Sequence, residues 1–380
     1  MVGCHGARVD APPEGVDAIA LLEHYATYPR IWAPWYTCHM IMRGLLDAYQ
    51  HAGNEQAFGI VRAMGDWAYS RLGHLPRTQL DRMWKIYIAG EYNAMPVVMA
   101  DLYALTGDEK YLTTAKCFDN TYLLEAAVAG EDTLDGEHAN QHIPQYQGYL
   151  EIYEQTGEQR YFAAAGDFWD MVVPHRTYVD GGMAGSGEMF GARDVIAATI
   201  QRDNAETCCV YNMLKLSRSL FFHTADPKYM QYYTRSSRTP VYFSSTDGSI
   251  LYVNLYLPST LDRPERGLTV TQSTDYPSDP AGTSTLTITG DAELDLRLRV
   301  PYWAERGFTV RLNGTPQPVA AVPGTYVSLK RRWRTGDRVE IAAPFTLRIE
   351  RALDDPATQA VAYGPVPLVI RSSATEYQKL

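Results

Sequence analysis

The residues best suited to chemistry lie in one short stretch, Asn-Ala-Glu-Thr-Cys-Cys at 204–209. In it, the carboxylate of Glu206 is followed closely by the adjacent thiols of Cys208 and Cys209. Apolar residues after them recur at helical spacing, so both thiols are expected in the first turn of a helix, where free backbone amides and the helix dipole favour the thiolate. Thiolates and a carboxylate are ligands that zinc prefers, which predicts a zinc site formed by these three residues. The alternative is that the two cysteines are small core residues at a helix start.

A glycine-rich segment at 178–190 carries a second carboxylate near its end, Glu188. Glycine-rich backbone can approach a ligand closely, because glycine has no side chain and few restrictions on its backbone angles. Glu188 and Glu206 therefore flank one loop between helices. Glycoside hydrolysis needs such a pair of carboxylates: one protonates the leaving oxygen, and the other attacks or orients the attacking group. The pattern makes Glu188 a candidate general acid.

Two histidines four residues apart, His138 and His142, precede a predicted helix. If both lay on one helical face, they could chelate a metal ion. The Ile-Pro pair that follows argues against this, because the residue before a proline is disfavoured in a helix. Contacts to sugar hydroxyls are the alternative. Trp35 and His39 lie at an expected loop-to-helix junction, where they could contact a sugar ring or pack in the core.

The first half of the chain, which carries these residues, is predicted to form paired helices. Three segments share one pattern: an amphipathic helix ends at a glycine, a polar residue follows, and a second helix begins. The glycines are Gly53, Gly107 and Gly157, and a degenerate fourth copy lies near Asp226. The glycine supplies the left-handed conformation at the helix end, and the polar residue can cap the next helix. Helix pairs that repeat about every 50 residues are typical of stacked hairpins, so we expect an α/α toroid, possibly incomplete, over residues 1–238.

In the second half, the period of the apolar pattern changes to two. Leucines alternate with charged residues at 294–299, which predicts a strand with one buried face. A hairpin turn is expected at the Asn-Gly pair 313–314, and further strands at 325–333 and 337–345. Short strands separated by Gly, Pro and Asn turns predict an antiparallel β-sandwich over residues 239–380.

The overall composition limits the possible partners. The chain has 380 residues, a net charge of −10 and a pI near 5.4, which argues against nucleic acid and anionic membranes as partners. The sequence has no apolar stretch of about 18 residues, so it predicts no membrane-spanning helix. Five scattered cysteines do not form a disulfide framework. The first residues lack the apolar core of a secretory signal, so we expect a cytoplasmic protein unless a signal was removed. A homo-oligomer is possible.

Several ordered segments together resemble one family of enzymes. They are WAPWYTCHMIMRGLLDAYQHAGNEQA, DLYALTGDEKYL, HANQHIP, FWDMVVPHRTYVDGGMAGSGEMF, AETCCVYNMLKLSRSLF, LYVNLYLPS and LRLRVPYWAERGFTVRLNG. They are similar to the beta-L-arabinofuranosidases of glycoside hydrolase families 127 and 146. The resemblance implies an (α/α)6 barrel followed by β-sandwich modules, and a retaining mechanism with zinc held by one Glu and three Cys, one of them the nucleophile. It implies that Glu188 is the general acid/base, that Glu206 and Cys208 bind zinc, and that His138 contacts the sugar.

The chain also departs from this family. Family members carry a second Cys-Cys segment before the strand that matches residues 251–256, whereas no cysteine follows Cys209 here. Cys209 is therefore the candidate for both the nucleophile and the third zinc ligand. The favoured function is hydrolysis of arabinofuranosides, on a small-molecule or oligosaccharide substrate. Three alternatives stay open: a carbohydrate-binding relative without hydrolysis, a shortened form of an active parent that needs a partner chain to cover its open toroid, and a sugar epimerase that uses His138 and His142 for proton transfer.

Overall fold

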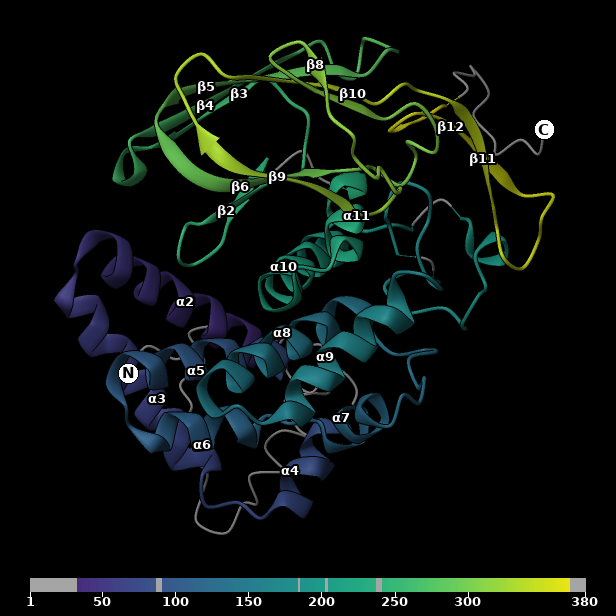
Figure 1. Cartoon of the computed structure of the whole chain (residues 1–380). Coiled ribbons are helices and arrows are strands. Elements are labelled where there is room, and N and C mark those ends of the chain that lie inside the picture. Colours follow the sequence, from purple (N-terminus) through teal and green to yellow (C-terminus); the bar gives the residue numbers. More distant parts are fainter. Residues whose placement is uncertain (1–32, 87–90, 184, 202–203, 237–240, 370–380) are drawn as a thin grey trace. The chain divides into compact units, whose positions relative to one another are not determined.

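The computed structural model describes residues 33–86, 91–183, 185–201, 204–236 and 241–369. The expected domain boundary at 238/239, together with Cys4 and Trp32, lies outside these ranges. The chain forms two compact units, one of helices and one mainly of strands (Figure 1). The helical unit comprises Met1–Arg176, Met183–Val195 and Thr199–Leu220. The β unit comprises Thr177–Gly182, Ile196–Ala198 and Phe221–Leu380.

Several pairs of consecutive helices that are joined by a short turn form hairpins (Figure 1). The helices are α2 (Pro34–Ala52), α3 (Glu55–Leu72), α4 (Arg77–Trp84), α5 (Met95–Thr106), α6 (Glu109–Cys117), α7 (Thr121–Val128), α8 (Ala139–Thr156), α9 (Gln159–Val172), α10 (Thr207–Thr224) and α11 (Pro227–Ser236). Short 3-10 turns are η2 (Tyr92–Ala94), η3 (Ala197–Thr199) and η4 (Pro264–Arg266). None of the described helices is long and apolar enough to cross a membrane.

The turns of the hairpins follow the predicted repeat. α2, α5 and α8 each end at a glycine with a positive φ angle: Gly53 at 64°, Gly107 at 67° and Gly157 at 71°. In the first two hairpins, Asn54 and Asp108 accept a hydrogen bond from a backbone amide of the next helix. The fourth hairpin has Ala225 in the left-handed conformation, with φ 54°, where the others have glycine. These local signals were sufficient to predict the hairpins.

The first helices of the hairpins form the centre of the helical unit. α5 lies between α2 and α8, and the second helices α3, α6 and α9 each pack on the first helix of their own hairpin. A Cβ atom added to Gly148 on α8 would lie 2.6 Å from the Cβ of Pro96 on α5, so these helices approach as closely as glycine allows. α10 is tied to α9 by a hydrogen bond from Trp169 Nε1 to Ser217 Oγ of 2.8 Å. The predicted α/α architecture is confirmed.

The β unit contains two larger sheets and one small one (Figure 1). Its strands are β1 (Tyr242–Ser244), β2 (Ile250–Val253), β3 (Ser259–Arg263), β4 (Leu268–Thr274), β5 (Thr283–Gly290), β6 (Ala292–Arg299), β7 (Thr309–Leu312), β8 (Thr315–Pro316), β9 (Tyr326–Trp333), β10 (Arg338–Ala342), β11 (Leu347–Arg351), β12 (Gln359–Tyr363) and β13 (Val366–Pro367). The sheets have the orders β1-β2-β6-β9, β3-β4-β5-β10-β7-β8 and β11-β12-β13.

The two larger sheets share one hydrophobic core, as a β-sandwich requires. Leu296 of β6 and Val270 of β4 belong to the same buried cluster although they come from different sheets. The predicted hairpin turn is present at Asn313, with φ 50°, and Gly314, with φ 79°, between β7 and β8. One feature differs from the prediction of an antiparallel sandwich, because β2 and β6 pair in parallel.

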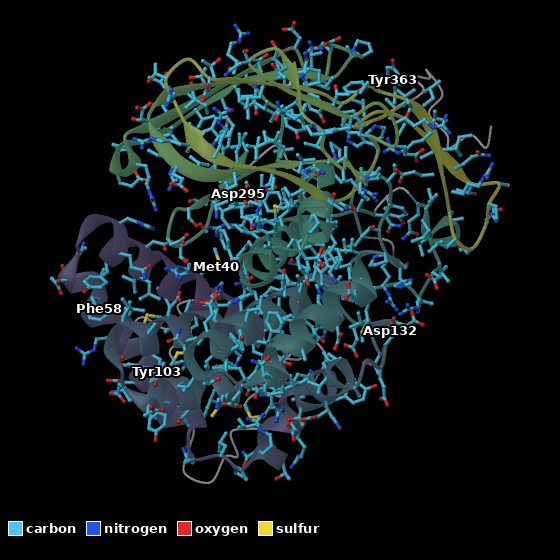
Figure 2. The ribbon with its side chains drawn as sticks, viewed as in Figure 1. Met40, Phe58, Tyr103, Asp132, Asp295 and Tyr363 are labelled. Atoms are coloured by element: carbon cyan, nitrogen blue, oxygen red, sulfur yellow. The ribbon has the colours of Figure 1, made fainter. Side chains whose placement is uncertain are left out.

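The charged face of β6 is more buried than the alternating pattern predicted. Asp295 is labelled in Figure 2. It is 8% exposed, and Arg299 is 3% exposed. Asp295 accepts hydrogen bonds from Arg297 Nε at 2.9 Å and from Ser328 Oγ at 2.5 Å. The predicted buried leucine face is confirmed, and these two charged residues of the other face are buried as well. Buried charges persist where other polar groups satisfy their hydrogen bonds.

Candidate functional site

The predicted acid, Glu188, is held by a short pairing of two loops. The amide of Ala139 donates to the Glu188 carbonyl at 2.8 Å, and the amide of Phe190 donates to the Glu137 carbonyl at 2.8 Å. His138 and Met189 form an isolated antiparallel bridge between these contacts. Two segments that the sequence presented separately, the glycine-rich segment and the histidine segment, are thus one structural element.

The glycine-rich segment turns tightly just before Glu188. A Cβ atom added to Gly185 would lie 1.8 Å from the carbonyl oxygen of Met189, so no other residue fits there without moving the backbone. The Met189 amide donates to the carbonyl of Ser186 at 3.2 Å and closes this turn. Gly185 is therefore needed for the compact turn that presents Glu188.

The side chain of Glu188 contacts the imidazole of His138. His138 Nε2 lies within hydrogen-bond distance of Glu188 Oε2, and His138 Nδ1 accepts a hydrogen bond from the Gln141 amide at 3.1 Å. Because Nδ1 is an acceptor, the proton of a neutral ring must sit on Nε2, from which it donates to Glu188. The His138 side chain is 6% exposed whereas that of Glu188 is 48% exposed. A buried, oriented imidazole thus holds one oxygen of a solvent-accessible carboxyl group.

The second histidine, His142, makes a parallel arrangement with a different carboxylate. His142 Nε2 lies 3.0 Å from Glu137 Oε2, and its Nδ1 lies 3.1 Å from Asn93 Nδ2. The hydrogen bond and charge of His142 outweigh burial and lower the pKa of Glu137. The two histidines point to separate carboxylates, which is not the geometry of a shared metal ligand pair.

The helix that carries His142 does not end where the sequence predicted. Pro144 lies inside α8, near its N-terminus, and the helix continues to Thr156. His138 is the N-cap of α8, and its ring accepts the Gln141 amide in place of the usual Ser or Asp side chain. The predicted helix end was wrong because a proline near a helix start removes only one early hydrogen bond.

A third carboxyl group, Glu91, lies near Glu188, and no sequence pattern pointed to it. Burial raises the pKa of Glu91, the charge of His138 lowers it, and the charge of Glu188 raises it. These effects place the three groups in one electrostatic neighbourhood. The backbone of Glu91 has φ 51°, which is uncommon for a residue with a side chain.

A buried arginine fixes the base of the loop that carries Glu188. Arg176 donates to both oxygens of Asp132, at 2.8 and 2.9 Å, to the Gly191 carbonyl at 2.7 Å and to the Met171 carbonyl at 2.8 Å. Burial raises the pKa of Asp132, but the hydrogen bonds and charge of Arg176 dominate and hold it below its usual value. This network joins the segment after α7, the end of α9 and the segment just after Glu188.

The two thiols lie in the first turn of α10, as predicted, because this helix begins at Thr207. The Cys208 thiol donates to Glu206 Oε2 at 3.0 Å. Burial, followed by the hydrogen bond and charge of Glu206, raises the pKa of Cys208 to about 11. Burial and the neighbouring Cys208 raise the pKa of Cys209 as well. Burial and the Glu206 carboxylate therefore oppose the effect that the helix start has on these thiols.

Both predicted carboxylates affect this turn electrostatically. The charges of Glu206 and Glu188 both contribute to the raised pKa of Cys209, so both groups lie within electrostatic range of one thiol. Cys209 is 2% exposed, whereas Cys208 is partly exposed. The site therefore combines an accessible acid, a buried imidazole, and a carboxylate in contact with a thiol. Such a set can donate a proton to a leaving group, and the Cys208 sulfur becomes nucleophilic once its proton has passed to a base such as Glu206.

Comparison with known protein families identifies the chain. Residues 12–254 match the family profile described as beta-L-arabinofuranosidase, GH127 catalytic domain, and residues 250–345 match the GH127 middle domain. The chain belongs to glycoside hydrolase family 127. A carbohydrate is therefore the expected class of substrate, as the sequence predicted. No protein with a curated description matches this GH127 chain.

Solved structures share the fold of this GH127 chain. A GH127 beta-arabinofuranosidase is 22% identical with a TM-score of 0.70, and the match covers 90% of this chain and 67% of that one. A glycoside hydrolase is 17% identical with a TM-score of 0.69, over 92% and 72% of the two chains. A GH127 beta-L-arabinofuranosidase from Geobacillus stearothermophilus T6 is 17% identical with a TM-score of 0.68, over 93% and 68%. At these identities the likeness concerns the fold.

The predicted zinc ligands are only partly assembled. Glu206 and Cys208 are in contact and could supply two of the four donors that zinc prefers. Cys209 is the next residue along the same helix and is enclosed in the core. Among the residues that the structure describes, no group of three or more His, Cys, Asp or Glu is arranged to hold a metal ion. The described donors do not complete a zinc site.

The other two residues predicted to contact sugar in this GH127 chain lie among packed side chains. The ring of Trp35 lies 5.0 Å from that of Phe118 and 5.7 Å from that of Trp67. His39 is buried, and burial, followed by the charge of Lys215, lowers its pKa to about 4. The packing alternative describes Trp35 well, and sugar contact by Trp35 and His39 stays a prediction.

Proposed function

We propose that this GH127 chain hydrolyses β-L-arabinofuranosides and that Glu188 is the general acid. The observation that carries the proposal is the contact between the accessible carboxyl group of Glu188 and the buried imidazole of His138. A general acid must be exposed to substrate and fixed in orientation, and this arrangement meets both conditions.

In this proposal, the Nε2–H of His138 holds one oxygen of Glu188. The other oxygen carries the proton, which passes to the glycosidic oxygen as the bond from the anomeric carbon to that oxygen breaks. His138 is a positioning residue, because it acts through Glu188. Its own orientation is fixed by the Gln141 amide on Nδ1.

A comparison of leaving groups tests the role of Glu188. The Glu188→Gln variant should lose roughly 100-fold or more in kcat/KM on a methoxyphenyl β-L-arabinofuranoside, whose leaving group needs protonation. On the dinitrophenyl furanoside, whose leaving group departs as a stable anion, the loss should be far smaller. Glu131→Gln is the matched control, because Glu131 is an exposed residue of the helical unit outside the site.

Two results would contradict this assignment. If Glu188→Gln kept full activity on both substrates, Glu188 would not be the acid. If it lost both activities equally while remaining folded, the role would be structural rather than acidic. A wild-type protein that binds arabinofuranosides without hydrolysing them would replace the proposed activity with the carbohydrate-binding alternative.

For the nucleophile, the proposal favours Cys208 over Cys209. The support is accessibility, because Cys208 is partly exposed and Cys209 is 2% exposed. The Cys208→Ser variant should lose turnover, whereas Cys209→Ser should keep turnover and chiefly lower thermal stability. The reverse pattern would return the nucleophile to Cys209.

The proposed zinc site is tested by measuring the zinc content of the protein. Glu206 and Cys208 would supply two donors, and a complete site would require further donors beyond the residues that the structure describes. Elemental analysis should find about one zinc per chain in the wild type and less in Cys208→Ser if the pair binds the metal. An equal zinc content in the two proteins would remove Cys208 from the ligand set.

A further inference from the structure

The segment between Glu188 and Glu206 passes through the β unit. Ile196–Ala198 belong to the β unit, whereas the chain up to Val195 and the chain from Thr199 belong to the helical unit. The connection between the two carboxyl groups therefore leaves the helical unit for three residues and returns to it. Whatever holds these three residues can affect the placement of both carboxyl groups.

One carboxylate of the β unit, Asp354, binds these three residues through their backbone. Its Oδ1 accepts hydrogen bonds from the amides of Ile196 and Ala197, at 2.9 and 2.8 Å, and its Oδ2 accepts one from the amide of Ala198 at 3.0 Å. Burial raises the pKa of Asp354, but the hydrogen bonds from these amides outweigh it and hold the pKa below its usual value. The charged carboxylate is thus the form that binds the segment.

The turn that carries Asp354 is closed by hydrogen bonds of its own. It joins β11 to β12, and the next residue, Asp355, accepts hydrogen bonds from the Ala357 amide at 3.0 Å and from the Thr358 hydroxyl at 2.9 Å. The Ala352 amide donates to the Thr358 carbonyl at 2.9 Å, at the end of the hairpin. Asp354 is therefore presented by an ordered turn.

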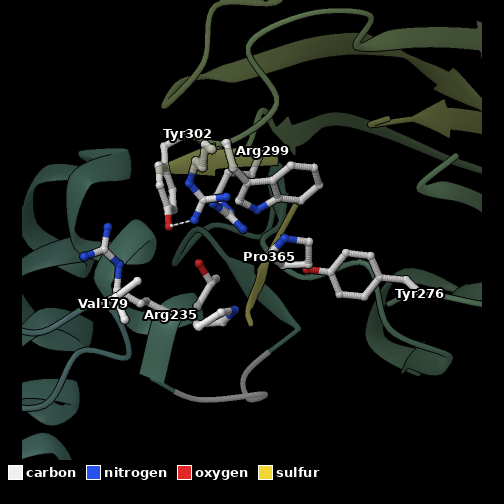
Figure 3. A pocket seen from close by; sticks show the side chains of 10 residues that line it. Val179, Arg235, Tyr276, Arg299, Tyr302 and Pro365 are labelled. Atoms are coloured by element: carbon white, nitrogen blue, oxygen red, sulfur yellow. Dashed lines mark hydrogen bonds between the residues drawn. The ribbon is translucent and has the colours of Figure 1, made fainter. Parts of the chain in front are cut away.

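The strand before this turn, β11, is fixed to the rest of the β unit by its charged residues. Arg348 Nη2 donates to the Tyr302 hydroxyl at 2.7 Å, the hydrogen bond that is dashed in Figure 3. The same nitrogen donates to Glu350 Oε1 at 2.9 Å, and Glu350 Oε2 lies 3.9 Å from Arg235 Nη2. The hairpin that ends in Asp354 thus has a fixed base as well as an ordered turn.

Hydrogen bonds also link the held segment to the residues just before each carboxyl group. The Asn204 side chain donates to the carbonyl of Thr199, the residue that follows the held ones. Gln201 Nε2 donates to Asn204 Oδ1 at 3.1 Å and to Ser186 Oγ at 3.4 Å. Asn204 and Ser186 each lie two residues before a carboxyl group of the site. A displacement of the held residues would therefore reach both groups.

The backbone on both sides of the held residues has an unfavourable conformation. Asp194 and Ala205 have φ angles of 64° and 61°, which are uncommon for residues with a Cβ atom. Such conformations persist only where the surrounding contacts impose them. Ala205 comes directly before Glu206, so loss of the contact to Asp354 should let this backbone relax and move the Glu206 carboxyl group.

We propose that Asp354 is a positioning residue for hydrolysis, because it holds the middle of the segment that connects Glu188 to Glu206. It acts through the backbone of residues 196–198 and not on the substrate. This role rests on the proposed function of Glu188. Asp354 lies beyond residues 12–254 and 250–345, which match the two family profiles, so neither profile includes it.

Steady-state kinetics of the full chain test this role. Asp354→Ala should lower kcat on the methoxyphenyl β-L-arabinofuranoside roughly 10-fold or more, with a smaller change in KM, because misplacement by about 1 Å can cost about 100-fold in rate. Asp279→Ala is the matched control. Asp279 is likewise an exposed aspartate of the β unit, and it accepts hydrogen bonds from the amides of Ala281 and Thr283 at 2.9 and 3.4 Å. Asp279→Ala should lower thermal stability about as much and leave kcat unchanged.

The conservative variant Asp354→Asn should restore part of the activity, and it also serves if Asp354→Ala fails to fold. Its remaining carbonyl oxygen can accept from the amides of Ile196 and Ala197, as Asp354 Oδ1 does. The acceptor for the Ala198 amide is lost. The kcat of Asp354→Asn should therefore lie between those of the wild type and Asp354→Ala.

Amide hydrogen exchange measures the same effect without turnover. In Asp354→Ala, exchange should be faster than in the wild type in the peptides that cover residues 185–191 and 204–214, because both segments depend on the held residues. In Asp279→Ala, exchange in these two peptides should not change.

Three results would overturn the role of Asp354. The first is an active wild type whose kcat is retained in Asp354→Ala. The second is an equal loss of kcat in Asp354→Ala and Asp279→Ala. The third is unchanged exchange of both peptides in Asp354→Ala. A wild type without turnover would instead contradict the proposed function, and faster exchange in Asp354→Ala would then still support the control of both segments by Asp354.

Discussion

Replacement of Arg176 by methionine should destabilise the helical unit strongly. The Arg176 side chain is 2% exposed and makes four hydrogen bonds, two to Asp132 and two to backbone carbonyls. The variant leaves the Asp132 carboxylate, whose side chain is 14% exposed, without its main partner (Figure 2). Removing one partner of a buried ion pair costs about 3–5 kcal/mol in the free energy of unfolding. The remaining contacts, from the Leu134 amide at 3.3 Å and from Arg193 Nη1 at 3.5 Å, are too long to offset this.

Urea unfolding followed by circular dichroism measures this loss. Arg193→Met is the matched control, because Arg193 contacts the same Asp132 but its side chain is 47% exposed. That substitution should cost less than about 1 kcal/mol. The double variant Arg176→Met, Asp132→Leu should recover part of the loss, because no unpaired buried charge remains. Equal, small losses in Arg176→Met and Arg193→Met would refute the argument.

The same pair predicts a dependence on pH. The pKa of Asp132 is lowered in the folded protein, despite the opposing effect of burial, by the hydrogen bonds and charge of Arg176. Its contribution to stability is therefore present above the unfolded pKa of about 4 and is lost as the pH falls through the lower, folded value. The difference in stability between wild type and Arg176→Met should narrow in this acidic range.

Two further predictions concern the helical core. The Gly148→Ala variant should destabilise the protein by about 1–3 kcal/mol, because the new Cβ would meet Pro96. The Gly166→Ala variant is the control, because Gly166 has open space around it. In the same thermal melts it should be neutral or stabilising by up to about 1 kcal/mol. Similar effects of the two would argue against the close approach of α5 and α8. Burial is the main reason that the pKa of His39 is lowered to about 4 in the folded protein. As the pH falls, this histidine is therefore protonated in the unfolded chain before it is protonated in the folded one. The free energy of unfolding should fall as the pH drops from about 6.5 to 4. The His39→Leu variant should flatten this dependence on pH. The His51→Leu variant is the control and should not, because His51 is an exposed histidine of the same helix. An unchanged dependence in His39→Leu would contradict the assignment.

The sequence by itself determined the elements and the family. Gly53 and Asn54 mark a helix end and the next helix start through local backbone preferences, and the structure has both features there. Asn313 and Gly314 likewise determined a two-residue hairpin turn. These signals act over a few residues, so they survive in the folded protein. Ordered motifs along the chain were sufficient to indicate glycoside hydrolase family 127, which the family profiles confirmed.

Only the tertiary structure decided the environment of the site. Glu91 joined Glu188 and His138 because distant segments fold together, and no local pattern encodes that proximity. The protonation of Cys208 also depended on tertiary structure, since its place at a helix start favours the thiolate while burial beside Glu206 favours the thiol. Capping and periodicity are properties of neighbouring residues, whereas burial and charge at a site are set by every element that packs around it. That difference is why the helices and strands could be read from the chain and the chemistry of the site could not.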